Sequence, residues 1–219
     1  MDGTLVDTEP YWHEAQIALV GSFGGSWTQS DGDSLIGTGL EHSARVIRNH
    51  GVDLSLPEII DYQTTFVLER VAQNVPWRPG ARELLAALKH AGVPTALVTM
   101  SYRRMADFMV ERIDFSAFDV IVAGDEVGHA KPHPEPYLRG ASLLGVDILD
   151  CVAIEDSPPG LASAMASGAV SIGVEHAAPL EHGAGYVRLD TLAGVTVDDL
   201  TLILDAGRAA RVNPIGDTP

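Results

Sequence analysis

Polar side chains that can handle a phosphoryl group stand at the ends of the apolar runs of this 219-residue chain. Thr99 ends the run PTALVT, Glu155 and Asp156 follow the run CVAI, Lys131 lies in the loop after DVIVA, and Asp2 stands at the N-terminus. Adjacent carboxylates supply the hard oxygen ligands that Mg²⁺ prefers. A hydroxyl and an ammonium group can hold a phosphoryl group, and an acid beside it can protonate a leaving oxygen. These residue types suit phosphoryl transfer, which needs mainly positioning and charge stabilisation.

The elements that must position these residues alternate along the second part of the chain. Apolar runs at 94–99, 119–123, 151–154 and 169–174 alternate with predicted helices at 81–91, 102–113, 136–144 and 161–167. This alternation indicates βαβ units and a parallel sheet that is covered on both faces. A last strand at 186–189 and a last helix at 197–204 are also predicted, and the polar tail from Asp205 is expected to fray. Because ligands bind beyond the carboxyl ends of parallel strands, we expect the polar residues to meet at one edge of the sheet.

The N-terminal third has a different pattern. Its polar and apolar residues have helical spacing at 13–23, 42–50 and 58–74, and no convincing strand occurs there. The sequence therefore predicts an α/β fold with a Rossmann-like parallel sheet core and an inserted α-helical domain. The core is expected over residues 1–9 plus 78–219 and the helical insert over 10–77, with hinges near Glu9–Pro10 and 75–80.

The composition limits the location and the partners. The chain carries 14 Lys and Arg against 30 Asp and Glu, a net charge of −16, which argues against a nucleic-acid or anionic-membrane surface. The single Cys151 rules out an intramolecular disulfide and fits a reducing compartment. No apolar run reaches the ~18 residues of a transmembrane helix, and the pattern of the first residues leads us to expect no secretory signal. We expect a cytoplasmic protein that is a monomer or a weak dimer and has no nucleic-acid or membrane partner.

Four segments together resemble, in order and spacing, the motifs of the haloacid dehalogenase-like hydrolases. They are MDGTLVDTE at 1–9, Thr99, KPHPEPY at 131–137 and IEDSPPG at 154–160. Any one of them would be weak alone, but four at the predicted strand ends extend the resemblance over essentially the whole chain. The chain is most similar to the branch with a helical cap, which holds phosphoglycolate phosphatase-like enzymes and β-phosphoglucomutase.

The resemblance implies a role for each matching residue. Asp2 matches the general acid/base, which also gives a backbone carbonyl to Mg²⁺. Thr99 matches the hydroxyl on the phosphate, and Lys131 matches the lysine that neutralises nucleophile and phosphate. Asp156 matches a direct Mg²⁺ ligand, and Glu155 one that acts directly or through water. Gly3 and Met100, beside these residues, are expected to contribute to phosphate binding, Met100 through its backbone N–H.

The nucleophile of the family is not among these residues. The family's first motif is Asp-x-Asp-Gly-Thr, in which Asp2 matches the second Asp and Met1 matches the x. The nucleophilic Asp and the first strand would therefore precede Met1. In one interpretation the natural protein extends upstream. In the other the chain is a real truncation, an inactive phosphate- or metal-binding module whose sheet would have two unpaired edges.

The helical insert bears on the branch and the substrate. The mutase of this branch uses a Lys and an Arg around the Gly37 loop, where this sequence has Ile36 and Leu40. The resemblance therefore favours a Mg²⁺-dependent phosphatase of a small phosphorylated metabolite, acting through an aspartyl-phosphate, over a β-phosphoglucomutase-like mutase. The candidate residues for the leaving-group pocket are Tyr11, Trp12, His13, Thr38, Glu41 and His42.

Two of these patterns have simpler interpretations when taken alone. Asp2-Gly3-Thr4 is a common turn, and Glu155-Asp156 could cap the helix that follows. His129 and His133 are four residues apart, but Pro132 between them prevents a helix, so this spacing does not predict a zinc site.

Overall fold

The computed structural model of the chain describes residues 1–181 and 185–212. Its helices are α1 (Glu9–Ser22), α2 (Gln29–Asp33), α3 (Leu40–Asn49), α4 (Leu56–Gln73), α5 (Ala81–His90), α6 (Arg103–Val110), α7 (Glu135–Leu144), α8 (Pro158–Ser167) and α9 (Val197–Val212), with short 3₁₀ turns at η1 (Gly124–Glu126) and η2 (Ile148–Asp150). Its strands are β1 (Ala96–Val98), β2 (Val120–Val122), β3 (Val152–Glu155), β4 (Val170–Val174) and β5 (Val187–Leu189). The fold is α/β, and the order of strands and helices agrees with the sequence patterns.

The strands form two parallel sheets rather than the single predicted sheet. One sheet pairs β1 with β2, and the other has the order β3-β4-β5. Within the described residues no strand joins β1 to β3. A cavity of about 220 Å³ is lined instead by Leu97 and Val98 of β1 and by Ala153 and Ile154 of β3. These two strands face an apolar gap and not each other, which leaves the two unpaired edges that are expected where the first strand is absent, and the predicted α/β fold with parallel strands is confirmed.

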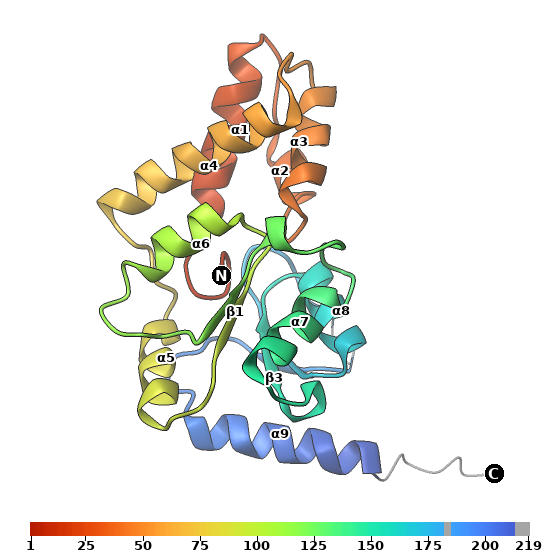
Figure 1. The fold of residues 1–219 in the computed structure, drawn as a ribbon. Coiled ribbons are helices and arrows are strands. Elements are labelled where there is room, and N and C mark those ends of the chain that lie inside the picture. The colour runs from red at the N-terminus through yellow and green to blue at the C-terminus, as the bar shows by residue number, and fades with distance from the viewer. Residues whose placement is uncertain (182–184, 213–219) are drawn as a thin grey trace, which may run out of the picture.

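The helices of the core cover the sheets and join them. Helix α7 packs on both β1 and β2, α8 packs on β3 and β4, and α9 packs on β4. Because α7 also contacts α8, a layer of helices bridges the two sheets (Figure 1). Both α7 and α8 end at glycines with positive φ, Gly145 and Gly168, in the left-handed conformation that commonly terminates helices.

Helices α1 to α4 lie together at one end of the molecule, above the sheets in Figure 1. Helices α1 and α3 both pack against α4. A capping box starts α4: Ser55 Oγ accepts from the Glu58 N–H at 3.4 Å, and Glu58 Oε2 accepts from the Ser55 N–H at 2.8 Å. Where the chain leaves this helical unit, Trp77 forms an antiparallel bridge with Val6, which ties the two ends of the insert together.

The largest differences from the predicted elements are in three helices. Helix α1 begins at Glu9, four residues early, so the expected hinge at Glu9–Pro10 is its first turn. Helix α2 was not predicted. Helix α9 continues to Val212, which corrects the prediction that the chain frays from Asp205, because Arg208 pairs with Asp150 at 2.7 Å. The rest of the predicted tail, 213–219, lies outside the described residues.

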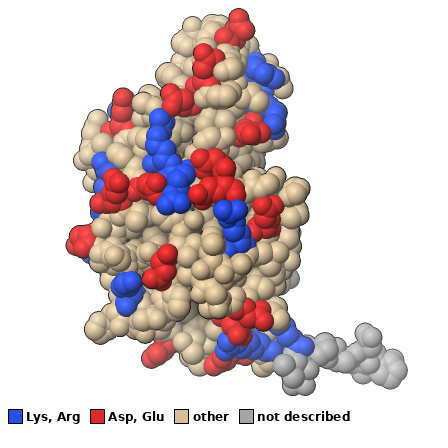
Figure 2. All heavy atoms as spheres, viewed as in Figure 1, with Lys and Arg blue, Asp and Glu red and all other residues tan. Residues whose placement is uncertain are grey.

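Charged side chains of both signs are mixed on the face shown in Figure 2, where Lys and Arg lie among Asp and Glu without a continuous basic area. Ion pairs such as Arg103 with Asp107 at 2.7 Å account for part of this mixing. Among the described residues, no helix combines the length and the apolar character that are needed to cross a membrane.

Candidate active site

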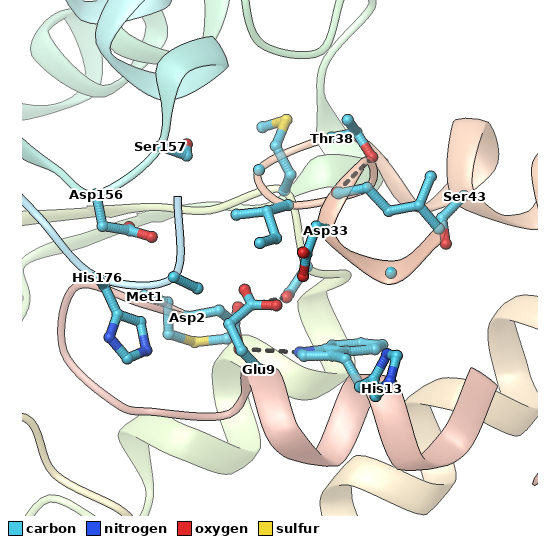
Figure 3. Close-up of a pocket in the computed structure, with 18 of the residues that line it drawn as sticks. Met1, Asp2, Glu9, His13, Asp33, Thr38, Ser43, Asp156, Ser157 and His176 are labelled. Carbon is cyan, nitrogen blue, oxygen red and sulfur yellow. Dashed lines mark hydrogen bonds between the residues drawn. The ribbon is translucent and has the colours of Figure 1, made fainter. Parts of the chain in front are cut away.

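A cavity of about 540 Å³ lies between the carboxyl ends of β1 and β3 and the helical unit (Figure 3). Six residues that were chosen from strand ends and loops line it: Asp2, Thr99, Met100, Lys131, Glu155 and Asp156. Trp12, His13 and Thr38 line it from the helical side. The structure therefore brings the predicted core residues together, although up to 154 positions separate them in the sequence.

Asp2 is held in place by three side-chain donors. Its Oδ1 accepts from Thr8 Oγ1 at 2.5 Å and from Trp12 Nε1 at 3.4 Å, and its Oδ2 accepts from Ser101 Oγ at 2.7 Å. Two of these donors come from the start of the helical unit and one from the loop after β1. The carboxyl group is therefore oriented at the border between the helical unit and the core.

Gly3 lets Asp156 approach the N-terminal turn. Gly3 has φ +70°, and a Cβ at this position would overlap the Asp156 carboxylate. Next to it, Thr4 Oγ1 donates to Asp156 Oδ1 at 2.6 Å. A glycine followed by a hydroxyl residue is thus what this close contact requires.

Lys131 and Glu155 form an almost fully buried ion pair, with side chains 7% and 6% exposed. The Tyr137 hydroxyl donates to the same Glu155 oxygen, and Lys131 Nζ also donates to the Val98 carbonyl at 3.1 Å. Burial alone would raise the pKa of Glu155, but the Lys131 charge and these hydrogen bonds bring that pKa below its usual value. Burial and the Glu155 charge raise the pKa of Tyr137 well above its usual value, so this hydroxyl remains a donor.

Asp156 lacks such a partner. It is 5% exposed, and among the described residues its side chain accepts a hydrogen bond from Thr4. Burial, followed by the charge of Glu155, raises the pKa of Asp156 to about 6. A buried carboxylate whose ionisation is disfavoured in this way, beside a second acid and a strand-end hydroxyl, is a suitable donor set for a hard divalent cation such as Mg²⁺.

The loop after β1 supplies two further groups. Thr99 is 3% exposed, and its Oγ1 accepts from the Ser101 N–H at 3.1 Å. The Thr99 N–H donates to the Val122 carbonyl at 3.0 Å, which continues the β1–β2 ladder to the edge of the cavity. Met100 lies beside the Lys131 backbone, whose N–H contacts its sulfur at 3.3 Å.

The helical wall of the cavity is acidic or neutral. Glu9 and Asp33 point toward one another in Figure 3. Burial, followed by the charges of Asp2, Asp156, Asp7 and Asp33, raises the pKa of Glu9 to about 8, so its carboxyl is mostly protonated at pH 7. Among the described residues that line the cavity, Lys131 is the one lysine or arginine. This wall can offer hydrogen bonds to hydroxyl groups but little attraction to a second anion.

Three residues that were predicted for the leaving-group pocket do not line this cavity. Tyr11 packs against the apolar core, Glu41 pairs with Arg45 on the surface at 2.8 Å, and His42 is exposed. Helical spacing turned these side chains away from the cavity, whereas Trp12 and His13 face it. His13 Nδ1 is buried and has no hydrogen-bond partner among the described residues.

Some cavity residues were not selected from the sequence. Ser101 follows β1 by three residues and His176 follows β4 by two, so the rule of looking just beyond strand ends could have found both. Glu9 and Asp33 lie in helices, and only the packing of the helical unit on the core brings them to the site.

Known proteins with a similar sequence or fold include hydrolases and phosphatases, and one solved structure of this group holds bound phosphate. Residues 1–168 match the family model described as haloacid dehalogenase-like hydrolase. Hexitol phosphatase B of Escherichia coli is 29% identical over 208 residues, covering 91% of this chain and 93% of that protein. Protein CbbY of Rhodobacter capsulatus is 36% identical over 181 residues, covering 77% and 79%. The crystal structure of CbbY from Rhodobacter sphaeroides in complex with phosphate superposes with a TM-score of 0.82 at 28% identity, covering 92% of this chain and 96% of that one.

Proposed function

The chain belongs to the haloacid dehalogenase-like hydrolases, and from this premise we propose that the protein acts as a Mg²⁺-dependent phosphatase that hydrolyses a small phosphorylated metabolite through an aspartyl-phosphate. The observation that carries the proposal is the buried Asp156 carboxylate, which has no cationic side chain on it and shares a cavity with Asp2, Thr99 and Lys131.

In this proposal, Asp156 and the backbone carbonyl of Asp2 hold the Mg²⁺ ion. Glu155 is tied to Lys131 and Tyr137, so it contributes through water and by fixing the ammonium group. When bound, the ion would offset negative charge on the transferring phosphoryl oxygens. The Gly3 and Met100 backbone, the Thr99 hydroxyl and the Lys131 ammonium group would orient the phosphoryl group.

Asp2 is proposed as the general acid and base. Its carboxyl group stands at the border with the helical unit, where the leaving group would lie, and three donors fix its direction. It would first protonate the leaving oxygen and then take a proton from the water that attacks the phosphorylated residue. The helical unit, residues 10–77, is proposed to act as a cap that excludes bulk water from these steps.

The attacking carboxylate is proposed to belong to a residue joined to the nitrogen of Met1. Met1 lines both the 540 Å³ cavity and the apolar gap between β1 and β3. Its amino group interacts electrostatically with Glu155 and Asp156. A residue at this point would face the Mg²⁺ ligands and Lys131, and an apolar strand before it would fill the gap between the sheets.

The leaving group is proposed to be neutral and rich in hydroxyls. The helical wall offers Glu9, His13 and Thr38 as hydrogen-bonding groups. Ile36 and Leu40 also line the cavity, at the positions where a mutase of this branch would need cations to clamp a phosphorylated sugar. A sugar or hexitol monophosphate is therefore favoured over a bisphosphate, and phosphatase activity over β-phosphoglucomutase-like activity.

The test compares three chains: the chain as given, the chain with an N-terminal apolar strand of about six residues that ends in Asp, and the same extended chain ending in Asn. Hydrolysis of p-nitrophenyl phosphate with Mg²⁺ is expected only with the Asp extension. Activity in the Asn extension would contradict the proposed nucleophile. Inactivity of all three chains against p-nitrophenyl phosphate and a panel of sugar monophosphates would favour the alternative, an inactive phosphate- or metal-binding module.

A further inference from the structure

The loop from Gly128 to Glu135 gathers two imidazoles and a carboxylate on the surface. His129, His133 and Glu135 each offer a ligand atom, and these atoms all lie within 4.8 Å of one another. Pro132 prevents a helix here, but a turn closed by the His133 N–H on the Ala130 carbonyl at 3.0 Å achieves the same proximity. The two rings stack with centroids 4.4 Å apart.

We propose that His129, His133 and Glu135 form a binding site for a divalent transition-metal ion of the zinc class. Ligand atoms in a tetrahedral zinc site are about 3.4 Å apart, given metal–ligand bonds of about 2.1 Å. The ligand atoms of His129, His133 and Glu135 lie at most about 1.4 Å farther apart than this. Rotation of these surface side chains can bring the atoms to the shorter distance. Water would complete the coordination.

The carboxylate of the site is already fixed and charged. Glu135 Oε1 accepts from the Gly128 N–H at 2.6 Å, and Oε2 lies 2.8 Å from His129 Nδ1. The Gly128 N–H and then His129 hold the pKa of Glu135 below its usual value. A backbone donor behind a carboxylate is the arrangement that orients metal ligands and sharpens their affinity.

The imidazoles can exchange their present contacts for a metal at small cost. The His129 side chain is 69% exposed, so its desolvation is minor. An ion on His129 Nδ1 would take the place of the hydrogen that this nitrogen shares with Glu135, and that hydrogen would move through water to His129 Nε2. His133 Nδ1 accepts a long hydrogen bond of 3.2 Å from the Glu135 N–H, which ligation through this nitrogen would break. Ser163 Oγ donates to the His133 carbonyl at 2.6 Å and keeps the backbone of the turn in place.

This site differs in chemistry from the carboxylate cavity. Imidazole nitrogens suit zinc, nickel and copper, whereas Mg²⁺ prefers oxygen ligands and keeps its water. The same loop carries Lys131 into the cavity, and Ala130 lies against the helical unit, where a Cβ at Gly39 would be 3.3 Å from the Ala130 Cβ. An ion bound by His129, His133 and Glu135 would therefore restrain the loop that carries both Lys131 and the Ala130 contact with the helical unit.

The test is calorimetric titration of the full chain with ZnCl₂ in the presence of excess MgCl₂, which under the proposed function would fill the carboxylate cavity. We expect one Zn²⁺ ion to bind per chain. His129→Gln and His133→Gln should each weaken the affinity by about tenfold or more. His90→Gln, an exposed histidine at the end of α5, is the matched control and should leave the affinity unchanged.

The outcomes separate cleanly because none of the three substitutions touches the core, and circular dichroism verifies that each variant is folded. If the unaltered chain does not bind Zn²⁺, the proposal is overturned. Binding that is equally strong in the His129→Gln, His133→Gln and His90→Gln variants would also overturn it, because the ion would then be held elsewhere.

Discussion

Lys131 and Glu155 pair inside the protein rather than on its surface, and the Tyr137 hydroxyl shares the same Glu155 oxygen. A charge pair of this kind helps little when intact, but the loss of one partner leaves the other buried and unpaired. The pair fixes the Lys131 side chain at the cavity, where the proposed phosphoryl group would bind.

Removal of Lys131 should therefore destabilise the fold as well as the site. We expect Lys131→Met to lower the free energy of unfolding in urea by about 3–5 kcal/mol, and the added Glu155→Gln to recover most of that loss. Lys89→Met is the control, because Lys89 pairs with Asp119 at 3.6 Å on the surface. It should change stability by less than about 1 kcal/mol. Equal effects of the two lysine substitutions would contradict the buried-pair account.

Asp156 should show a conflict between stability and function. The pKa of Asp156 is raised from 3.8 to about 6, so the ionised carboxylate destabilises the folded state. This destabilisation is about 3 kcal/mol at most. Asp156→Asn keeps an acceptor for Thr4 and removes this cost. We expect a higher melting temperature than the unaltered chain in EDTA, and no further gain on adding Mg²⁺. A Mg²⁺-dependent rise of the same size in both proteins would rule Asp156 out as a ligand.

Gly3 can be tested against a glycine with similar backbone geometry. Gly3 and Gly24 have φ +70° and +76°, but a Cβ at Gly24 would meet nothing within 4 Å. Gly24→Ala should thus cost only the strain of the left-handed conformation, about 1 kcal/mol. Gly3→Ala adds a collision with Asp156 and should cost more in urea unfolding and also weaken the Mg²⁺ response. The same loss in both variants would show that the Asp156 contact is unimportant.

The raised pKa of Glu9 should make the stability of the fold decrease as the pH rises. Its pKa is raised in the folded state from 4.5 to about 8, so between these values the folded chain holds a proton that the unfolded chain has released. Glu9 therefore makes stability fall as pH rises through this range, by at most about 1.4 kcal/mol per pH unit. Glu9→Gln should flatten this slope when unfolding is followed in EDTA. Glu14→Gln, on the same helix, should not, and an unchanged slope in both would contradict the burial of Glu9.

The sequence was sufficient to predict those parts of the fold that local chemistry determines. Glycines such as Gly145 and Gly168 end helices, as predicted. The cap of α8 is Ser157, whose Oγ accepts from the Gly160 N–H at 3.2 Å, and not the Glu155-Asp156 pair that the sequence offered for this role. The alternation of apolar runs and helices predicted the order of the core elements. Looking beyond strand ends then identified Thr99 and Asp156 before any packing was known.

The remaining features depend on contacts between distant segments. The burial of Glu9 needs α1 to pack over the cavity, and no local pattern reveals a raised pKa. The cluster of His129, His133 and Glu135 depends on a turn around Pro132, which helical spacing excluded. The gap between β1 and β3 depends on which strands pair, and apolar runs alone do not specify their neighbours.

The most direct test of the central claim is the rate of Mg²⁺-dependent p-nitrophenyl phosphate hydrolysis by the Asp-extended chain with and without Asp2→Asn. Asn can still accept from Thr8, so the turn and the border with the helical unit should be retained. The account predicts a loss of about 10²–10⁴-fold, which is what proton transfer by a positioned carboxyl group contributes, with Mg²⁺ binding unchanged. A rate within a few-fold of the unaltered extended chain would contradict the assignment of Asp2 as the acid and base of this site.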